Sequence, residues 1–257
     1  MTFIIAEAGV NHNGDVGQAL LLANAAKESG ADAVKFQHFN SQRLWGDDRI
    51  KRLELTDAEM AVIAAHCRAI GIEFMCTPFG VPEVEALRPL VRRWKVASGC
   101  LTRWDLLAAI RATGLPVILS TGMADMNRIE RAEAAVSPTA ILHCTSAYPC
   151  PVADVHLAAM DALRARWGNA AAVGYSDHTP GIVIALAAVA RGAEVLEKHL
   201  TLDRWQEGPD HKASIEPKEF RIMVDAIRTI EQAIGKPEKR PQASEAQVME
   251  AWYGHSR

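Results

Sequence analysis

The sequence has few cysteines, no long apolar run and no cluster of basic residues. Its five cysteines among 257 residues are an odd number at irregular spacing, which favours reduced thiols in a cytoplasmic protein over a disulfide framework. No segment reaches about 18 consecutive apolar residues, so no membrane span is expected. The N-terminus lacks the basic region of a signal peptide. A net charge of −3 without a basic stripe argues against nucleic-acid binding.

The sequence motifs of several common enzyme classes are also lacking. No phosphate-binding P-loop, nucleophile elbow or dinucleotide-binding glycine motif follows an expected strand. ATP-dependent, serine-hydrolase and dinucleotide chemistry are therefore disfavoured. What remains is an ordinary globular composition, 49% hydrophobic and 23% charged, in a chain of about the length of one α/β barrel.

Short apolar runs alternate with helix-like stretches along the chain. Eight runs are expected to be strands: 3–7, 33–37, 72–77, 94–98, 117–121, 140–145, 172–176 and 194–199. Eight stretches have helical patterns: 16–29, 56–69, 81–87, 103–113, 126–135, 155–167, 181–191 and 217–234. Continuous apolar runs are typical of parallel strands covered on both faces. The alternation predicts an α/β fold, a single-domain (β/α)8 TIM barrel over residues 1–235. A polar C-terminal tail over residues 236–257 follows the barrel, and residues 245–252 of this tail are a candidate helix.

In such a barrel the reactive side chains lie at the carboxyl ends of the strands. All eight expected strands end in polar residues, so we expect one convergent polar pocket. Lys35 and Lys95 lie within or at the end of apolar strands and need an anionic partner. That partner is a substrate anion or, alternatively, Glu7 or Glu197 in a structural ion pair. Hydroxyl and glycine residues at the same ends are typical of a phosphate or carboxylate cradle: Ser98, Gly99, Ser120, Gly122 and Ser176.

Histidines end two neighbouring strands. His178 and His199, with the carboxylates of Glu7, Glu197 and Asp210 available, can hold a divalent cation that keeps open positions. Such an ion polarises a carbonyl and lowers the pKa of bound water. The alternative is that each histidine only forms hydrogen bonds within the pocket.

Two other histidines have no clear assignment from the sequence. His143 lies in an apolar strand, where a core role and a catalytic role are equally compatible with the pattern. His12 precedes Asn13 and Gly14, which would serve equally well as a turn.

Nine segments in chain order match the motifs of a known family. They are IIAEAGVNHNG (4–14), VKFQ (34–37), CTPF (76–79), KVASG (95–99), LSTGM (119–123), LHCTSAYP (142–149), GYSDHT (174–179), EKHLT (197–201) and GPDHK (208–212). In these segments the chain resembles the sialic acid synthases, which condense phosphoenolpyruvate with an N-acetylated amino sugar. The match extends from residue 4 to about residue 235.

The resemblance implies a divalent metal, Mn2+ or Mg2+, on His178 and His199. It implies that phosphoenolpyruvate is held by basic and hydroxyl side chains: Lys35, Thr77, Lys95, Ser98, Ser120 and Ser176, with Ser146 where the family often has Asn. It also implies that a further set faces the sugar or the reacting centre: substrate-binding Gln37 and catalytic Glu7, Tyr148, Glu197 and Asp210. The implied reaction is attack by C3 of phosphoenolpyruvate on the metal-polarised aldehyde, addition of water at C2 and loss of phosphate by C–O cleavage.

The chain departs from the family pattern after the barrel. Family members usually continue into a small domain resembling antifreeze proteins, which in a swapped dimer supplies an Arg to the partner's sugar pocket. This sequence stops at Arg257, so that Arg is expected to be missing, and the loop over residues 38–49 is short beside the family's usual form. We therefore expect a separate lid-domain protein, a different acceptor or weakened activity. A homodimer is expected by analogy only.

The expected product is a sialic-acid-like 2-keto-3-deoxy sugar acid, with the acceptor left open among N-acetylmannosamine, its 6-phosphate and a di-N-acetylated hexose. One alternative function is a metal-dependent keto-acid aldolase or lyase on the same barrel. Another is a non-catalytic, barrel-only partner of a full-length synthase. The intact set of Lys35, Lys95, His178 and His199 argues against lost chemistry.

Overall fold

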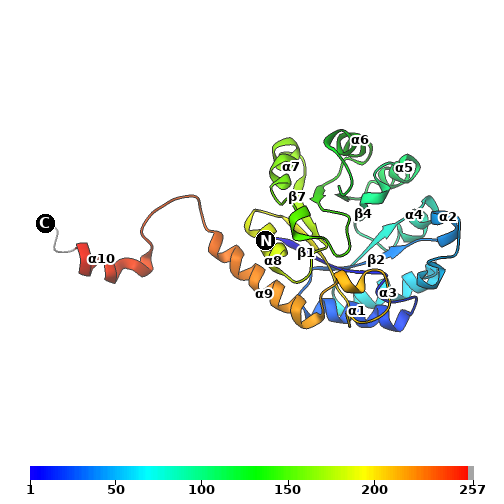
Figure 1. The fold of residues 1–257 in the computed structure, drawn as a ribbon, viewed down its shortest axis with the longest axis horizontal. Coiled ribbons are helices and arrows are strands. Elements are labelled where there is room, and N and C mark those ends of the chain that lie inside the picture. The colour runs from blue at the N-terminus through cyan, green and yellow to red at the C-terminus, as the bar shows by residue number, and fades with distance from the viewer. Residues whose placement is uncertain (254–257) are drawn as a thin grey trace.

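A computed structural model describes residues 1–253 and has the expected barrel architecture (Figure 1). Its strands are β1 (Phe3–Gly9), β2 (Ala33–His38), β3 (Glu73–Pro78), β4 (Trp94–Val96), β5 (Val117–Ser120), β6 (Ala140–His143), β7 (Ala172–Asp177) and β8 (Val195–His199). All hydrogen-bonded neighbours are parallel, in the order β3-β2-β1-β8-β7-β6-β5-β4. The end strands β3 and β4 lie side by side, which brings the sheet round into a barrel. The predicted fold class is confirmed.

Helices follow the strands and cover the outside of the sheet (Figure 1). The α-helices are α1 (Val16–Glu28), α2 (Ser41–Trp45), α3 (Asp57–Ile70), α4 (Val81–Leu87), α5 (Trp104–Ala112), α6 (Met126–Val136), α7 (Ala159–Trp167), α8 (Val183–Ala190), α9 (Pro217–Ile234) and α10 (Ala246–Tyr253). Short 3-10 helices are η1 (Lys51–Leu53), η2 (Ser98–Cys100), η3 (Val152–Asp154), η4 (His211–Ala213) and η5 (Ala243–Glu245). At the start of α3, Thr56 and Glu59 form the capping box that their spacing predicts.

The barrel interior is built in layers because residues two apart on a strand point to the same face. One layer is apolar and forms a separate cluster: Ile5, Ala33, Met75, Ile118, Ala140, Leu142 and Val195. Two residues beyond five of these positions, the same strands carry the polar residues Glu7, Lys35, Thr77, Ser120 and Glu197. The apolar layer thus closes the barrel beneath a polar layer at the carboxyl ends, where a barrel places its chemistry.

The structure corrects several predicted boundaries. Strand β4 ends at Val96 because residues 98–100 turn into η2, and β6 ends at His143. The helix predicted from residue 155 begins only at Ala159, because His156 has φ 45°, a left-handed conformation that a helix does not accept. The loop after β2 contains α2 and η1, which the sequence reading did not predict.

The C-terminal tail leaves the barrel after α9. Figure 1 shows residues 236–253 extending away from the barrel, with α10 at their far end. Helix α10 lies where the sequence places a candidate helix. The rest of the tail, residues 254–257, lies outside the described residues. Within residues 1–253, none of the helices is both long and apolar enough to span a membrane.

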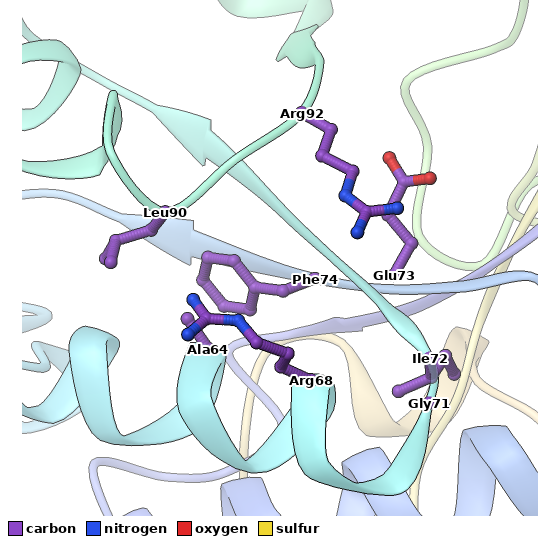
Figure 2. Close-up of a pocket in the computed structure, with 8 residues that line it drawn as sticks. All are labelled: Ala64, Arg68, Gly71, Ile72, Glu73, Phe74, Leu90 and Arg92. Carbon is purple, nitrogen blue, oxygen red and sulfur yellow. The ribbon is translucent and has the colours of Figure 1, made fainter.

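One cavity opens at the end of the barrel opposite the polar layer. It has a volume of about 250 Å3, and its lining includes Arg68 on α3, Glu73 at the start of β3 and Arg92 just before β4 (Figure 2). The residues that line it precede or begin their strands. Because barrel enzymes place their reacting groups at the other end of the strands, this cavity is not the candidate active site.

Candidate active site

A polar cavity lies at the carboxyl ends of the strands. Its lining comes from nearly every strand of the barrel: Glu7, Lys35, Gln37, Thr77, Lys95, Ala97, Ser98, Ser120, Cys144, Tyr148, Ser176, His178, Glu197 and His199. Every residue that the resemblance implies for metal, phosphoenolpyruvate or sugar lines this cavity except Ser146 and Asp210, which lie beside it. Gly99 and Gly122, expected in the anion cradle, lie outside its lining. The strands thus bring together residues that are far apart in the chain.

Strand register explains the closest contacts. Glu7 on β1 lies opposite Lys35 on β2 and opposite His199 on β8. Lys35 Nζ lies 2.8 Å from Glu7 Oε2 and 3.6 Å from Glu197 Oε2, and it donates a hydrogen bond of 3.1 Å to Thr77 Oγ1. The sequence left two partners open for Lys35, a substrate anion or a structural ion pair with Glu7 or Glu197. The ion pair is present, and it forms part of the cavity wall.

Lys95 forms the second cationic point of the cavity. Its Nζ donates a hydrogen bond of 2.7 Å to Ser120 Oγ and lies 3.6 Å from Glu197 Oε1. Burial lowers the pKa of Lys95, and the nearby Glu197 partly opposes that effect. Two buried lysines and two buried carboxyls therefore share one small polar volume, in which Lys95 and Glu197 form an ion pair at 3.6 Å.

The two carboxyls have opposite proton affinities. Burial raises the pKa of Glu7 to about 7, and the neighbouring Glu197 adds to this effect against the attraction of Lys35. Burial also acts on Glu197, but Lys35, Lys95 and a 2.9 Å hydrogen bond from Ser176 Oγ outweigh it and lower its pKa to about 2. Glu197 is thus the ionised carboxylate, and Glu7 can take up or release a proton near neutral pH.

A hydroxyl cradle lies on the side of β4 and β5. The Gly122 backbone N–H donates to Ser98 Oγ at 2.9 Å, and Ser98 Oγ lies 3.3 Å from Cys144 Sγ. A Cβ on Gly122 would lie only 2.3 Å from Ser146 Oγ and 2.9 Å from Ser98 Oγ. Gly122 therefore lets the two hydroxyls approach each other, with Ser146 just outside the cavity lining. Cys144 is buried and also lines the cavity.

The histidine pair lies next to the carboxylate cluster. The ring centroids of His178 and His199 are 5.5 Å apart. His178 Nδ1 lies 2.7 Å from the Thr145 carbonyl oxygen, so this nitrogen carries the proton and Nε2 has the free lone pair. Burial lowers the pKa of both rings, and for His199 the neighbouring His178 adds to the effect. Both imidazoles are therefore neutral.

These residues fit an open divalent-metal site. His199 Nδ1 is buried without a hydrogen-bond partner among residues 1–253 and lies 3.8 Å from Asp210 Oδ2. The hydrogen bond from His178 to a carbonyl oxygen is the outer-shell contact that ligating histidines usually make. Among the described residues there is no ready group of three or more His, Cys, Asp or Glu ligands. A metal here would rely on substrate or water for its remaining positions.

Tyr148, Asp210 and Gln37 line the outer side of the histidine pair. The Tyr148 ring lies 4.2 Å from the His178 ring and 5.6 Å from the His199 ring, and burial raises the pKa of its phenol, which stays protonated. Burial raises the pKa of the Asp210 carboxyl to about 6. Gln37 Nε2 donates to Glu7 Oε1 at 3.1 Å. These groups also line the cavity next to the polar one.

The two histidines without a sequence assignment lie outside this cavity. His143 Nε2 contacts the Val155 carbonyl oxygen at 2.7 Å, a bond within the fold. His12 is fully buried, and its Nδ1 accepts a hydrogen bond of 3.0 Å from the Gly14 N–H. Neither lines the polar cavity, so both support the structure around it.

A second, larger cavity adjoins the polar one. Its volume is about 260 Å3, and it shares Gln37, Tyr148 and His199 with the polar cavity. The rest of its lining comes mainly from the loop between β2 and α3: Val10, Phe39, Leu44, Trp45, Arg49, Ile50, Leu53, Phe79, Pro209 and Asp210. The sequence reading missed this apolar wall because residues 39–53 lack the regular spacing of a strand or a long helix.

Comparison with known proteins identifies the family. The model of the NeuB family matches residues 22–239, most of the chain. The chain belongs to the NeuB family. It is 40% identical to the N,N'-diacetyllegionaminic acid synthase of Legionella pneumophila, over 96% of this chain and 77% of that protein. It is 35% identical to the N-acetylneuraminate-9-phosphate synthase of Mus musculus, over 93% of this chain and 72% of that protein.

Solved structures agree with this assignment. The N-acetylneuraminic acid synthetase of Leptospira borgpetersenii, determined with citrate, is 38% identical and superposes with a TM-score of 0.91, over 100% of this chain and 93% of that one. A truncated 3-deoxy-D-arabino-heptulosonate 7-phosphate synthase of Thermotoga maritima has a TM-score of 0.73 at 15% identity, which shows the shared barrel fold alone. This NeuB-family chain is therefore an enzyme of the sialic acid synthase class, as its sequence motifs predict.

Proposed function

We propose that this enzyme condenses phosphoenolpyruvate with an N-acetylmannosamine-like aldehyde sugar to give a 2-keto-3-deoxy sugar acid and phosphate. The observation that carries this proposal is the polar cavity in which buried Lys35 and Lys95 stand among hydroxyls beside a neutral histidine pair. Membership of a family whose named relatives make legionaminic, pseudaminic and neuraminic acids supports the same reaction class.

The polar cavity can hold a compact molecule with two anionic groups. Lys95 Nζ and Ser120 Oγ, with Ser98 Oγ and the Gly122 N–H beyond them, supply a cation and hydroxyl donors for phosphate oxygens. Lys35 and Thr77 offer donors on the opposite side for a carboxylate. Because these donors, of which only Ser98 is half-buried and the others are buried, are already held by neighbouring groups, they bind an anion with little reorganisation. Phosphoenolpyruvate, which has a phosphate and a carboxylate, matches such a pair of sites.

The carboxyl groups of Glu7 and Asp210 can donate and accept the protons that the reaction requires. Attack by C3 of phosphoenolpyruvate on the aldehyde carbon leaves an oxygen that must be protonated, and water adding at C2 must lose a proton before phosphate departs by C–O cleavage. Glu7, with a pKa of about 7, and Asp210, with a pKa of about 6, can exchange protons at neutral pH. Glu197 stays ionised and keeps both lysines in place.

The metal belongs to this proposal as a cofactor. His178 and His199, with Asp210 nearby, would hold a divalent ion, Mn2+ or Mg2+. Such an ion supplies Lewis-acid polarisation of the acceptor carbonyl when bound. The Tyr148 ring packs on both histidines.

Phosphate release tests the reaction. Purified enzyme is mixed with phosphoenolpyruvate, Mn2+ and a panel of N-acylated aldehyde sugars, and free phosphate and 2-keto acid are both measured. We expect one phosphate for each keto acid formed, and only with an acceptor present. Cleavage of the keto acid to pyruvate without phosphate would instead indicate an aldolase on the same barrel. No phosphate with any acceptor would overturn the proposed condensation.

A further inference from the structure

The loop between β2 and α3 turns the barrel mouth into an apolar chamber. Phe39 and Leu53 from this loop pack with Val10 in a separate hydrophobic cluster, against which Leu44 and Ile50 also pack. The Phe39 and Phe79 rings meet edge to face with centroids 6.1 Å apart. These contacts fix the loop over the mouth, so the 260 Å3 cavity has a preformed wall within this chain.

The chamber opens directly onto the reacting groups. Gln37, Tyr148 and His199 line both this cavity and the polar one. A molecule that placed its aldehyde beside His199 would therefore have the remainder of its carbon chain in the apolar chamber. The polar cavity, at about 50 Å3, is the smaller of the two, so the chamber is the space for the larger substrate.

Charge in the chamber disfavours a phosphorylated substrate. Among the lining residues, Arg49 is the sole Lys or Arg, and its Nε lies 2.9 Å and 2.8 Å from the two carboxylate oxygens of Asp47. The same guanidinium lies over the Trp45 ring, 5.6 Å from its centroid. Besides the shared Tyr148 and His199, the remaining ionisable lining group is the Asp210 carboxyl. A phosphate placed here would meet mainly apolar carbon, a carboxyl and a guanidinium already paired with Asp47, without the lysine, serine and threonine donors of the polar cavity.

We propose that the acceptor of this enzyme is an uncharged aldehyde sugar with apolar substituents, such as N-acyl methyl or deoxy groups, on the end away from the aldehyde, and that Leu44, Ile50 and Leu53 select it over a sugar phosphate. This inference rests on the proposed function, because it concerns the second substrate of the same reaction.

The test compares three acceptors with the full chain, Mn2+ and phosphoenolpyruvate. They are N-acetylmannosamine, its 6-phosphate, and a 2,4-di-N-acetylated 6-deoxyhexose. We expect kcat/KM to rise in the order 6-phosphate, N-acetylmannosamine, di-N-acetylated sugar, by about tenfold or more per step, the size of effect that one apolar group has in a fitted pocket. If phosphate is released but the 6-phosphate is the better substrate, this inference fails while the proposed condensation stands.

Ile50→Lys tests the wall itself. A lysine in the chamber should raise kcat/KM for the 6-phosphate relative to N-acetylmannosamine by about tenfold, since one favourable charge contact contributes more than 1 kcal/mol in a partly desolvated site. Val62→Lys, an equal change at an exposed position of α3, is the matched control and should leave the ratio unchanged. An unchanged ratio in a folded Ile50→Lys enzyme would overturn the assignment of this wall.

Binding of the acceptor sugar can be measured without turnover. Trp45 lines the chamber and is half-exposed, so its fluorescence should change when the di-N-acetylated sugar is titrated and should not change with the 6-phosphate at the same concentrations. The Trp45→Phe variant identifies the signal among the six tryptophans of the chain. If no acceptor gives phosphate but this signal appears, the chamber assignment stands and the reaction fails. Equal signals from both sugars would overturn the inference.

Discussion

The rings of His178 and His199 lie 5.5 Å apart at the ends of adjacent strands β7 and β8. Both rings are buried and neutral, and His199 Nδ1 has no hydrogen-bond partner. A buried polar atom without a partner is costly unless something binds it. The described residues thus leave one buried acceptor of this pair without a partner, and we propose that a divalent cation binds there.

Replacing His199 tests this proposal. His199→Ala should abolish binding of Mn2+ and lower kcat/KM by about a thousandfold or more, because a Lewis-acid ion contributes several kcal/mol to such a reaction. The far-ultraviolet circular dichroism should stay that of the wild type. His66→Ala, at a histidine of α3 that contacts Asn24, is the control and should keep its metal. Wild-type turnover by His199→Ala in the presence of chelator would contradict the metal assignment.

Removal of Lys35 should affect stability and binding together. Lys35→Met leaves Glu7 and Glu197 close together without their shared cation, at a cost of about 3–5 kcal/mol in the free energy of unfolding. Adding Glu7→Gln should recover a large part of that loss in urea denaturation, because the two changes act on one ion pair.

Neither the single nor the double variant should bind phosphoenolpyruvate measurably by calorimetry. Lys218→Met, at an exposed position of α9, is the control for loss of one positive charge. Wild-type affinity for phosphoenolpyruvate in Lys35→Met would show that the lysine serves the fold alone.

Two glycines offer a matched pair of variants. In Gly122→Ala the added methyl group would lie 2.3 Å from Ser146 Oγ and 2.9 Å from Ser98 Oγ, so the hydroxyl cradle must move. We expect the KM for phosphoenolpyruvate to rise about tenfold or more, because small displacements of positioned groups are costly in a preorganised site. In Gly99→Ala the methyl group meets nothing within 4 Å, and KM should not change. Equal kinetics in the two variants would argue against an anion site at Ser98.

His12 should make stability depend on pH. Burial lowers its pKa from the ordinary 6.5 to about 4, so between these values the unfolded chain binds a proton that the folded chain does not. The contribution is present above pH 6.5 and is lost as the pH falls toward 4, by roughly 3 kcal/mol in all. His12→Asn should lose this dependence, so the difference in urea midpoint between wild type and variant should shrink from pH 7.5 to pH 4.5. A constant difference would contradict the low pKa.

Much of the fold could be predicted from the sequence because its determinants are local. Continuous apolar runs marked the strands, and Thr56 with Glu59 marked the start of α3. The same runs located Lys35, Lys95, His178 and His199 at strand ends, and a barrel brings strand ends together whatever their separation in the chain.

The remaining features depend on contacts that spacing does not encode. The start of α7 is set by the left-handed backbone at His156, and the sequence pattern continued through it. The second cavity depends on how residues 39–53 fold back onto Val10 and Phe79. No periodic spacing of apolar residues in the sequence predicts this long-range packing. The opposite proton affinities of Glu7 and Glu197 follow from which carboxyl has Lys95 and Ser176 beside it.

A crystal structure of the full chain soaked with phosphoenolpyruvate and Mn2+ tests the central claim most directly. We predict an anomalous manganese peak bonded to His178 and His199, and phosphoenolpyruvate in the polar cavity with its phosphate between Lys95, Ser120 and Ser98. The His199→Ala crystal treated in the same way should lack the manganese peak. Phosphoenolpyruvate bound elsewhere, or manganese absent from the two histidines at saturating concentration, would contradict the account.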